Sequence, residues 1–169
     1  DLWKKWHHIL ADRLLARWTD RITINARNIR QYLTEVEKIN SSKIVTIYNG
    51  IDLKRCRVDA LAGLRVKEEL GISKDALVVG MISRFAEQKD YDTFFNAAEK
   101  VINRLPNIYF VAVGDGRLLS SHKSQVTSHK LENRIIFTGL RRDVPDLINA
   151  MDICVLSSHY EGCPNVILE

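Results

Sequence analysis

The chain has 169 residues, of which 46% are hydrophobic and 27% are charged, and its formal net charge at pH 7 is +4. This composition is ordinary for a globular chain with a real core, and the length favours one compact domain. So mild a charge fits an anionic small ligand or an acidic membrane surface better than a duplex nucleic-acid binder, which would need a dense basic stripe. The sequence shows no signal peptide and no long apolar span. Because the first residue is Asp1 rather than Met, we expect a piece of a longer protein.

The three cysteines, Cys56, Cys154 and Cys163, are widely spaced and form no Cys-x-x-Cys pair. Cys154 stands inside an apolar run, where a thiol is usually a small hydrophobic side chain. This pattern favours a reducing compartment over secretion.

Residues 1–18 are predicted to form a basic amphipathic helix. The large apolar side chains that fall near one face are Trp3, Trp6, Leu10, Leu14 and Trp18. Such a helix can lie on a membrane surface, although a surface helix docked on a core is the commoner case.

A short strand over residues 21–25 and a helix over residues 26–38 follow. The helix residues expected to face inward are Ile29, Leu33 and Val36. Residues 43–48 alternate as a strand that stops at Asn49-Gly50, which is a turn signal. Residues 52–57 are mostly charged and are the best linker candidate.

Strands and helices then alternate four times. The predicted strands cover residues 77–82, 108–113, 134–138 and 152–156. The predicted helices cover residues 58–70, 91–105, 117–131 and 144–150. The strands are continuous apolar runs, as expected of strands buried on both faces. This order predicts an α/β fold with a doubly wound parallel sheet.

Ligands of an open parallel sheet bind beyond the carboxyl ends of its strands. The loops predicted to lie there contain glycine, cations or carboxylates, and they cover residues 83–89, 114–117, 139–142 and 157–169. None of them contains the spaced Gly-x-Gly-x-x-Gly pattern of dinucleotide binders, which argues against an NAD enzyme.

Arg84 and Lys89 are the natural anion-binding pair in the first of these loops. A guanidinium makes planar two-pronged bonds to phosphate oxygens, and an ammonium adds a mobile point charge. Lys89 precedes a predicted helix start at Asp90, where unpaired backbone N–H groups and the helix dipole also favour an anion. The alternative is a solvated pair of surface charges bonded to Glu87.

Gly114-Asp115-Gly116 and Gly139 are weaker signals. Glycines at the end of a strand can permit a sharp turn, or they can let a ligand approach the backbone closely. Gly139 in particular could let a flat base lie against the main chain. Both interpretations stay open on these residues alone.

The last loop sets Glu161 and Glu169 eight positions apart. Gly162 and Pro164 predict a tight turn that carries Glu161, followed by a helix whose early turns carry Glu169. His159 is a candidate for substrate contact, although a histidine can serve many surface roles. The histidines and these glutamates show no metal-ligand spacing, so we expect no metal.

Four motifs occur in order along the chain, and together they resemble the donor-binding half of the retaining GT-B glycosyltransferases of family 4. They are Arg84-x4-Lys89, Gly114-Asp115-Gly116, Phe137-x-Gly139 and Glu161-x7-Glu169. The segment Tyr48-Asn49-Gly50-Ile51-Asp52 is similar to the Asn-Gly-Val/Ile-Asp segment before the hinge between the two domains of that family. Many members have phenylalanine where Cys163 stands. The resemblance runs from about Arg13 to the last residue.

The resemblance implies that residues 1–52 are the tail of an N-terminal acceptor domain. Residues 53–169 would be an incomplete, Rossmann-like nucleotide-sugar domain, truncated at its C-terminus. Arg84 and Lys89 would hold the diphosphate, and Glu161 would lie near the donor sugar as a third catalytic residue. The residues implied to bind the donor are Gly114, Asp115, Gly116, Gly139, Gly162, Cys163, Pro164, Asn165 and Glu169, the last through the ribose hydroxyls.

The implied reaction transfers a sugar from a UDP- or GDP-type donor to a sugar, lipid-linked or glycan acceptor, with retention, in polysaccharide or glycolipid synthesis. Fixed cations aimed at the leaving diphosphate lower the barrier without a metal or other cofactor. The implied location is the cytoplasm, with peripheral membrane contact through the first helix as a further hypothesis; no nucleic acid is expected. The alternatives are a GT-B sugar-nucleotide epimerase and a nucleotide-binding module without catalysis. We expect the chain alone to bind a nucleoside diphosphate weakly and to transfer nothing.

Overall fold

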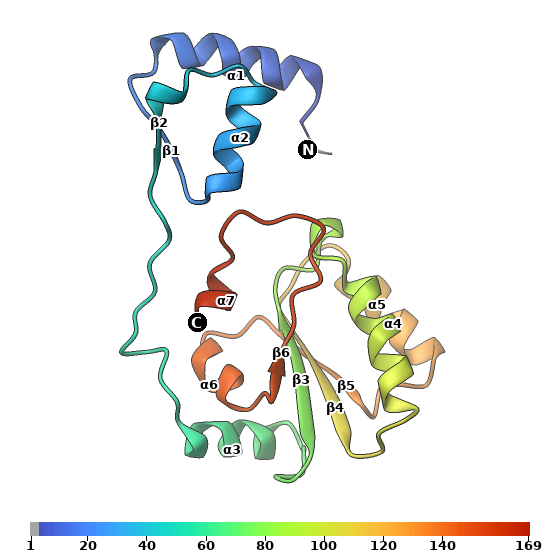
Figure 1. The fold of residues 1–169 in the computed structure, drawn as a ribbon. Helices are drawn as coiled ribbons and strands as arrows, with labels where there is room; N and C mark the ends of the chain where they lie inside the picture. The colour runs from blue at the N-terminus through green and yellow to red at the C-terminus, as the bar shows by residue number, and fades with distance from the viewer. Residues whose placement is uncertain (1–3) are drawn as a thin grey trace. The chain divides into compact units, whose positions relative to one another are not determined.

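The computed structural model describes residues 4–169, and its ribbon is shown in Figure 1. The chain divides into two compact units. The first contains the chain up to Ile51 together with Glu161–Leu168, and the second contains Asp52–Tyr160 and Glu169. The contacts therefore group residues 161–168 with the first unit, whereas the sequence assigned them to the nucleotide-sugar domain. The division into acceptor and donor domains stays a prediction.

The first unit is built on a two-stranded parallel sheet, in which β1 (Ile22–Ile24) pairs with β2 (Ile44–Thr46). Its helices are α1 (Trp6–Trp18), α2 (Arg27–Glu35), the 3-10 turn Ser41–Lys43 and the four-residue α7 (Asn165–Leu168). Its core consists of Ala16, Ile24, Leu33, Ile39 and Ile44. The predicted order of helix, strand, helix and strand is confirmed, with shorter elements.

The apolar face predicted for the first helix is not its buried face. Trp6 and Trp18 are 77% and 84% exposed, and Leu10 and Leu14 are exposed as well, whereas Ala16 is buried. Trp3 lies outside the described residues. Polar bonds hold α1 to its unit, since Arg13 Nε donates to the Glu37 carbonyl over 3.0 Å. Val36, predicted to face inward, is exposed because it caps the end of α2. No helix within residues 4–169 has the length and apolarity to cross a membrane.

The second unit is a four-stranded parallel sheet in the order β5-β4-β3-β6. Its strands are β3 (Leu77–Ile82), β4 (Ile108–Val113), β5 (Ile135–Gly139) and β6 (Ile153–Cys154). Its helices are α3 (Ala60–Glu69), the 3-10 turn η2 (Glu87–Lys89), α4 (Tyr91–Ile102), α5 (Leu119–Ser128) and α6 (Val144–Asn149). Helices pack on both faces of the sheet, so the predicted doubly wound α/β fold is confirmed.

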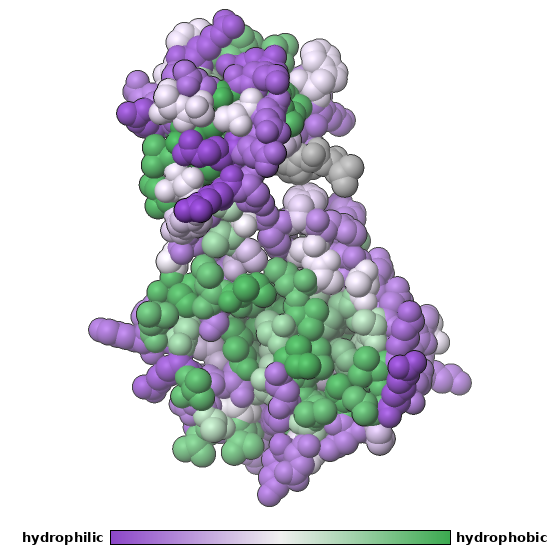
Figure 2. All heavy atoms as spheres, viewed as in Figure 1, coloured by the Kyte–Doolittle hydropathy of each residue, from purple (hydrophilic) through white to green (hydrophobic). Residues whose placement is uncertain are grey.

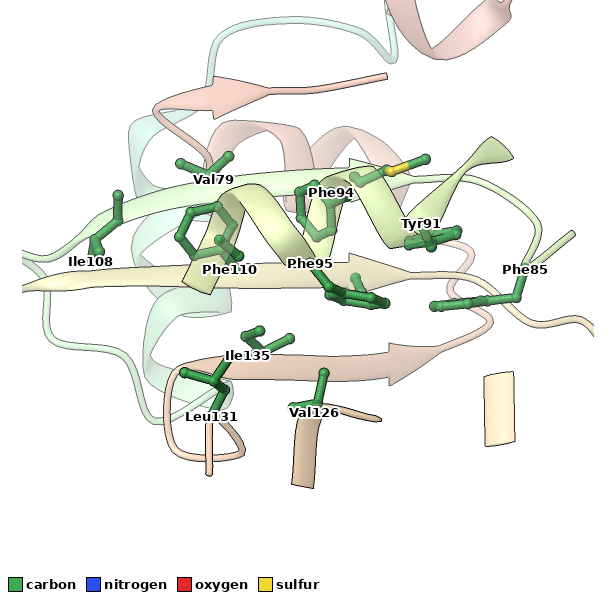
Figure 3. Close-up of a cluster of buried hydrophobic side chains, with 13 residues drawn as sticks. Val79, Phe85, Tyr91, Phe94, Phe95, Ile108, Phe110, Val126, Leu131 and Ile135 are labelled. Atoms are coloured by element: carbon green, nitrogen blue, oxygen red, sulfur yellow. The ribbon is translucent and has the colours of Figure 1, made fainter. Parts of the chain in front are cut away.

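Aromatic side chains fill the face of the sheet covered by α4 and α5. Figure 3 shows Phe94 and Phe95 of α4 pointing at the strands, with Phe110 of β4 among them. Tyr91 and Phe85 extend this cluster toward the carboxyl ends of the strands. Burying such large side chains is a main source of stability in a domain of this size, and here it also anchors the loop after β3.

The opposite face of the sheet is covered by α3 and α6. Its buried residues are Val66, Ile72, Ala76, Val78, Val111, Val113, Leu147 and Ala150. Gly63 of α3 lies against α6, because a Cβ at this position would stand 2.2 Å from the carbonyl oxygen of Asn149. A glycine is therefore required for the two helices to approach so closely.

The last strand differs most from its prediction. The apolar run at residues 153–156 was expected to be a buried strand, but β6 pairs over only two residues, and Ile153 is 58% exposed. The reason is its place at the edge of the described sheet, beside β3 alone. Figure 2 shows hydrophobic residues gathered on the face of the second unit where Figure 1 places β3 and β6.

Candidate functional site

The loop after β3 is anchored by Phe85. This side chain is fully buried, and its ring stacks on the ring of Tyr91 at 3.9 Å between centroids. The Tyr91 hydroxyl donates to the Ser83 carbonyl over 3.0 Å, and the Ser83 N–H donates to the Val113 carbonyl over the same distance. Arg84 therefore stands between two fixed residues, with its own side chain exposed.

Gly114 and Gly116 let the loop after β4 lie directly against the loop after β3. A Cβ on Gly114 would stand 2.0 Å from the Ser83 carbonyl oxygen, and one on Gly116 would stand 2.4 Å from that of Phe85. Both glycines have positive φ angles, +138° and +155°. The backbone N–H of Phe85 donates to the Asp115 carbonyl over 2.9 Å. These glycines thus have a structural role in packing one loop on the other, besides any role toward a ligand.

Lys89 ends the 3-10 turn η2, directly before α4. The helix starts where predicted, but Asp90 at its N-cap accepts a bond from the backbone N–H of Thr93 over 3.1 Å. Although partial burial opposes ionisation, the bonds from Thr93 and the charge of His159 lower the pKa of Asp90. The expectation that unpaired N–H groups at this helix start favour an anion is therefore wrong in part, because a carboxylate of the chain already occupies the first turn.

Glu87 pairs with Arg117 across the two loops, so it does not serve as the partner of Arg84 that the alternative interpretation suggested. Within residues 4–169, no hydrogen bond or ion pair engages the Arg84 guanidinium. An exposed cation on a rigid loop is suited to bind an anion from solution.

The loop after β6 is bound to the turn before α4. Ser157 Oγ donates to the Asp90 carbonyl over 2.8 Å, and the His159 N–H donates to the Gln88 carbonyl over 2.9 Å. Gln88 Nε2 donates in return to the Tyr160 carbonyl over 2.8 Å. The imidazole of His159 lies 3.8 Å from the Asp90 carboxylate. These bonds hold together the loops that follow neighbouring strands β3 and β6.

The hydroxyl oxygens of Ser83 and Ser158 are enclosed and have no hydrogen-bond partner among the described residues. Buried hydroxyl groups normally have a partner. Sequence reasoning missed both residues. The available signal was a polar residue near the end of an apolar run, since Ser83 directly follows β3 and Ser158 is the second residue after Leu156.

Gly139 ends β5 with a φ angle of +71°, and a Cβ added to it would meet no atom within 4 Å. The main chain is therefore open on that side, as the hypothesis of a flat base requires. The loop is then fixed by Arg141, whose guanidinium binds Glu69 and also Asp143, with Nε at 2.8 Å from Oδ1 of Asp143. The bonds from Arg141 lower the pKa values of both carboxyl groups.

The segment with Glu161 belongs to the first unit, where asparagine side chains surround it. Asn49 Nδ2 donates to the Cys163 carbonyl over 3.0 Å and to Oδ1 of Asn165 over 2.8 Å. Asn28 Nδ2 donates to the Glu161 carbonyl over 3.4 Å. Pro164 directly precedes α7, whereas the sequence suggested that it lies in the first turn of the helix. The prediction that the early turns of this helix carry Glu169 is wrong, because α7 ends at Leu168; Glu169 follows the helix, is exposed and groups with the second unit.

The structure thus brings the predicted site residues together in two sets. Arg84, Lys89, Gly114, Asp115, Gly116 and Gly139 lie on the loops of the second unit, and Gly162, Cys163, Pro164 and Asn165 follow Glu161 in the first. Among residues 4–169, no three His, Cys, Asp or Glu side chains are grouped so that they could hold a metal ion.

Comparison with known proteins places these loops in a family. Residues 76–169, which contain the loops after all four strands of the second unit, match the family described as glycosyl transferases group 1. The chain belongs to this family.

Among its relatives, this group 1 chain is 32% identical over 168 residues to the UDP-Gal:alpha-D-GlcNAc-diphosphoundecaprenol alpha-1,3-galactosyltransferase of Escherichia coli, covering 98% of the chain and 42% of the relative. The chain spans less than half the length of the curated relatives that it matches first.

Solved structures of glycosyltransferases share the fold. Anabaena Alr3699/HepE, solved in complex with UDP and glucose, superposes with a TM-score of 0.83 at 23% identity, covering 92% of this chain and 43% of that one. The C-terminal domain of LpcC, a group 1 protein of Francisella tularensis, gives a TM-score of 0.58 at 25% identity, covering 67% and 61%. The predicted fold class, the C-terminal half of a GT-B glycosyltransferase, is confirmed.

Proposed function

We propose that this group 1 chain is the donor-binding part of a retaining glycosyltransferase of family 4, which transfers a sugar from a UDP-sugar to an acceptor. The observation that carries the proposal is the rigid loop after β3, at the carboxyl edge of the sheet. This loop presents the exposed Arg84, and it also contains Lys89, six residues after Ser83. UDP is favoured over GDP because HepE was solved with UDP and the Escherichia coli relative is named for a UDP-sugar.

In the proposed reaction the bond between the anomeric carbon and the diphosphate breaks. Charge grows on the leaving oxygen, and Arg84 and Lys89 stabilise it more strongly in the transition state than in the bound donor. Since two cations already supply this charge, we expect no metal. The diphosphate would lie over Gly114, Asp115 and Gly116.

Carboxylates and backbone N–H groups would bind the rest of the donor. Glu161 accepts hydrogen bonds from sugar hydroxyls, and Glu169 accepts them from the ribose. The residues Gly162, Cys163, Pro164 and Asn165 would form the turn beside the sugar. The base would lie against Gly139, where the main chain is open.

We also propose the roles of the two units. The first unit would be the tail of an acceptor domain, and the chain alone would bind nucleotide without transferring sugar, since transfer needs an acceptor cleft. The complete protein would act in the cytoplasm, in polysaccharide or glycolipid synthesis. A lipid-linked acceptor is favoured by the name of the Escherichia coli relative, which contains a diphosphoundecaprenol group. The epimerase and the non-catalytic module are disfavoured by the family match.

Peripheral membrane contact is a further part of the proposal. It is supported by the exposed Trp6 and Trp18 on α1, a helix that also carries the exposed cation Arg17. Sedimentation with vesicles of anionic phospholipid tests it: the chain should pellet with them, and a W6S/W18S variant should stay in solution. Equal sedimentation of both proteins would refute this part of the proposal.

Sugar transfer by the complete protein tests the proposed reaction. We expect Glu161→Ala to lower kcat by about a hundredfold or more, because a contact to the reacting sugar is lost. The product of the wild-type enzyme should retain the anomeric configuration of the donor, which one-bond couplings in its NMR spectrum report. Undiminished turnover in the variant would remove Glu161 from the site.

A further inference from the structure

Asn49 belongs to a sequence motif that has no role in the proposed chemistry. It lies three residues past the end of β2 and is half-buried within the first unit. Its side-chain nitrogen donates to the Cys163 carbonyl over 3.0 Å and to Oδ1 of Asn165 over 2.8 Å. A backbone carbonyl can only accept, so the side-chain group of Asn49 that faces Cys163 must be its NH2. One amide therefore uses both of its protons on a single short segment.

That segment has little conformational preference of its own. It contains Gly162, which is free to adopt many backbone angles, and α7, which has only four residues and cannot be stable by itself. Two further contacts join the segment to the same unit. Asn28 donates to the Glu161 carbonyl over a long 3.4 Å, and a Cβ on Gly162 would stand 2.8 Å from Oδ1 of Asn25.

We propose that Asn49 is a positioning residue for the donor sugar, and that it acts by fixing the turn that carries Glu161. This inference rests on the proposed function for the role of Glu161, but the bonds on which it depends are present without any donor. Asn49 does not touch the reacting atoms. It holds the Cys163 carbonyl and the Asn165 side chain, and so it sets the direction in which the turn presents the carboxylate two residues earlier.

Hydrogen–deuterium exchange of the chain separates this role from simple packing. In Asn49→Ala both donated bonds are lost, and amides of the peptide covering residues 161–168 should exchange about five- to tenfold faster. Asn49→Asp keeps the shape but turns an oxygen toward two acceptors, so exchange should be faster still. If Asn49 only fills space, the order reverses, because aspartate has nearly the volume of asparagine. Asn133→Asp, at an exposed position with the same charge change, is the matched control and should leave exchange unchanged.

Kinetics of the complete enzyme test the consequence for catalysis. In Asn49→Asp, kcat should fall about tenfold, because small misplacements of a group near the reacting atoms are costly. The affinity for UDP should change less than about twofold, since Arg84 and Lys89 are untouched. A loss of UDP affinity with kcat preserved would overturn the inference. If the wild-type protein transfers no sugar, the proposed function fails, while the exchange order in the three variants still decides whether Asn49 holds the turn.

Discussion

Tyr91 connects the aromatic core to the loop that carries Arg84. Its ring stacks on Phe85, and its hydroxyl donates to the carbonyl groups of Ser83 and Val113, over 3.0 and 3.3 Å. Burial raises the pKa of Tyr91 to about 12. One side chain therefore fixes the ends of two neighbouring strands at the edge where the ligand is proposed to bind.

The raised pKa of Tyr91 predicts a pH dependence of stability. Between pH 10 and about 12 the unfolded chain loses the phenolic proton while the folded chain keeps it. The free energy of unfolding is therefore unaffected below pH 10 and falls as the pH rises through this range, by roughly 1 kcal/mol at pH 11.

Urea denaturation of Tyr91→Phe isolates this effect from other titrations. At pH 8 the variant should be less stable than the wild type by about 1 kcal/mol, because the hydroxyl bonds are lost. At pH 11 the difference should nearly vanish. A constant difference at both pH values would show that Tyr91 ionises equally in the folded and unfolded chains.

Gly114 is the second residue on which the loop geometry depends. Its φ angle of +138° disfavours any side chain. A Cβ would stand 2.0 Å from the Ser83 carbonyl oxygen in the loop after β3, and this backbone atom cannot easily move aside. Gly114→Ala should lower the free energy of unfolding by roughly 2–4 kcal/mol. Gly50→Ala is the control, since a Cβ there meets nothing within 4 Å. Equal urea midpoints for the two variants would contradict the packing described.

At the scale of elements, Arg141 fastens the loop after β5 to the end of α3. It binds Glu69 and Asp143, and its bonds lower the pKa values of both carboxyl groups. The stabilisation is therefore fully present above about pH 4, where carboxyl groups of the unfolded chain are ionised. It is lost as the pH falls through the lowered pKa values of the folded chain.

Arg141→Gln should accordingly lower the melting temperature by about 3 °C at pH 7, and the difference from wild type should disappear near pH 2. The exposed neighbour Arg142 provides the matched control, because Arg142→Gln removes the same charge without these bonds. Calorimetry at both pH values checks this. Equal losses in the two variants would mean that net charge, and not the bridge, is responsible.

Elements buried on both faces were the most predictable from sequence. The apolar runs at β3 and β4 have the predicted bounds to the residue. The predicted helices were too long where capping was not considered. Helix α3 begins at Ala60 and not at residue 58, because the Asp59 carboxylate caps it by accepting a bond from the Ala62 N–H over 3.0 Å. The length of β6, which has two residues, was overestimated because apolar content does not reveal whether a strand lies at the edge of a sheet.

At the scale of the whole molecule, the sequence predicted which loops carry the chemistry but not how they are held. Strand order places Arg84, Gly114 and Gly139 at one sheet edge, which follows from parallel pairing alone. Three features depend on contacts between segments that are distant in sequence. They are the left-handed backbone of Asp90, the contact of Gly114 with Ser83 and the hydrogen bonds of the Asn49 side chain. Such contacts leave no local pattern that periodicity or propensity can detect.

The central claim is that the second unit binds a nucleoside diphosphate through Arg84. Isothermal titration of the chain with UDP and with GDP tests it directly. The wild type should release heat of binding with UDP, and Arg84→Ala should weaken the affinity about tenfold or more, because a charge-assisted bond to phosphate is lost. Arg104→Ala, at an exposed arginine past the other end of α4, should bind as the wild type does. Absence of heat with both nucleotides, or equal affinity in Arg84→Ala, would contradict the claim.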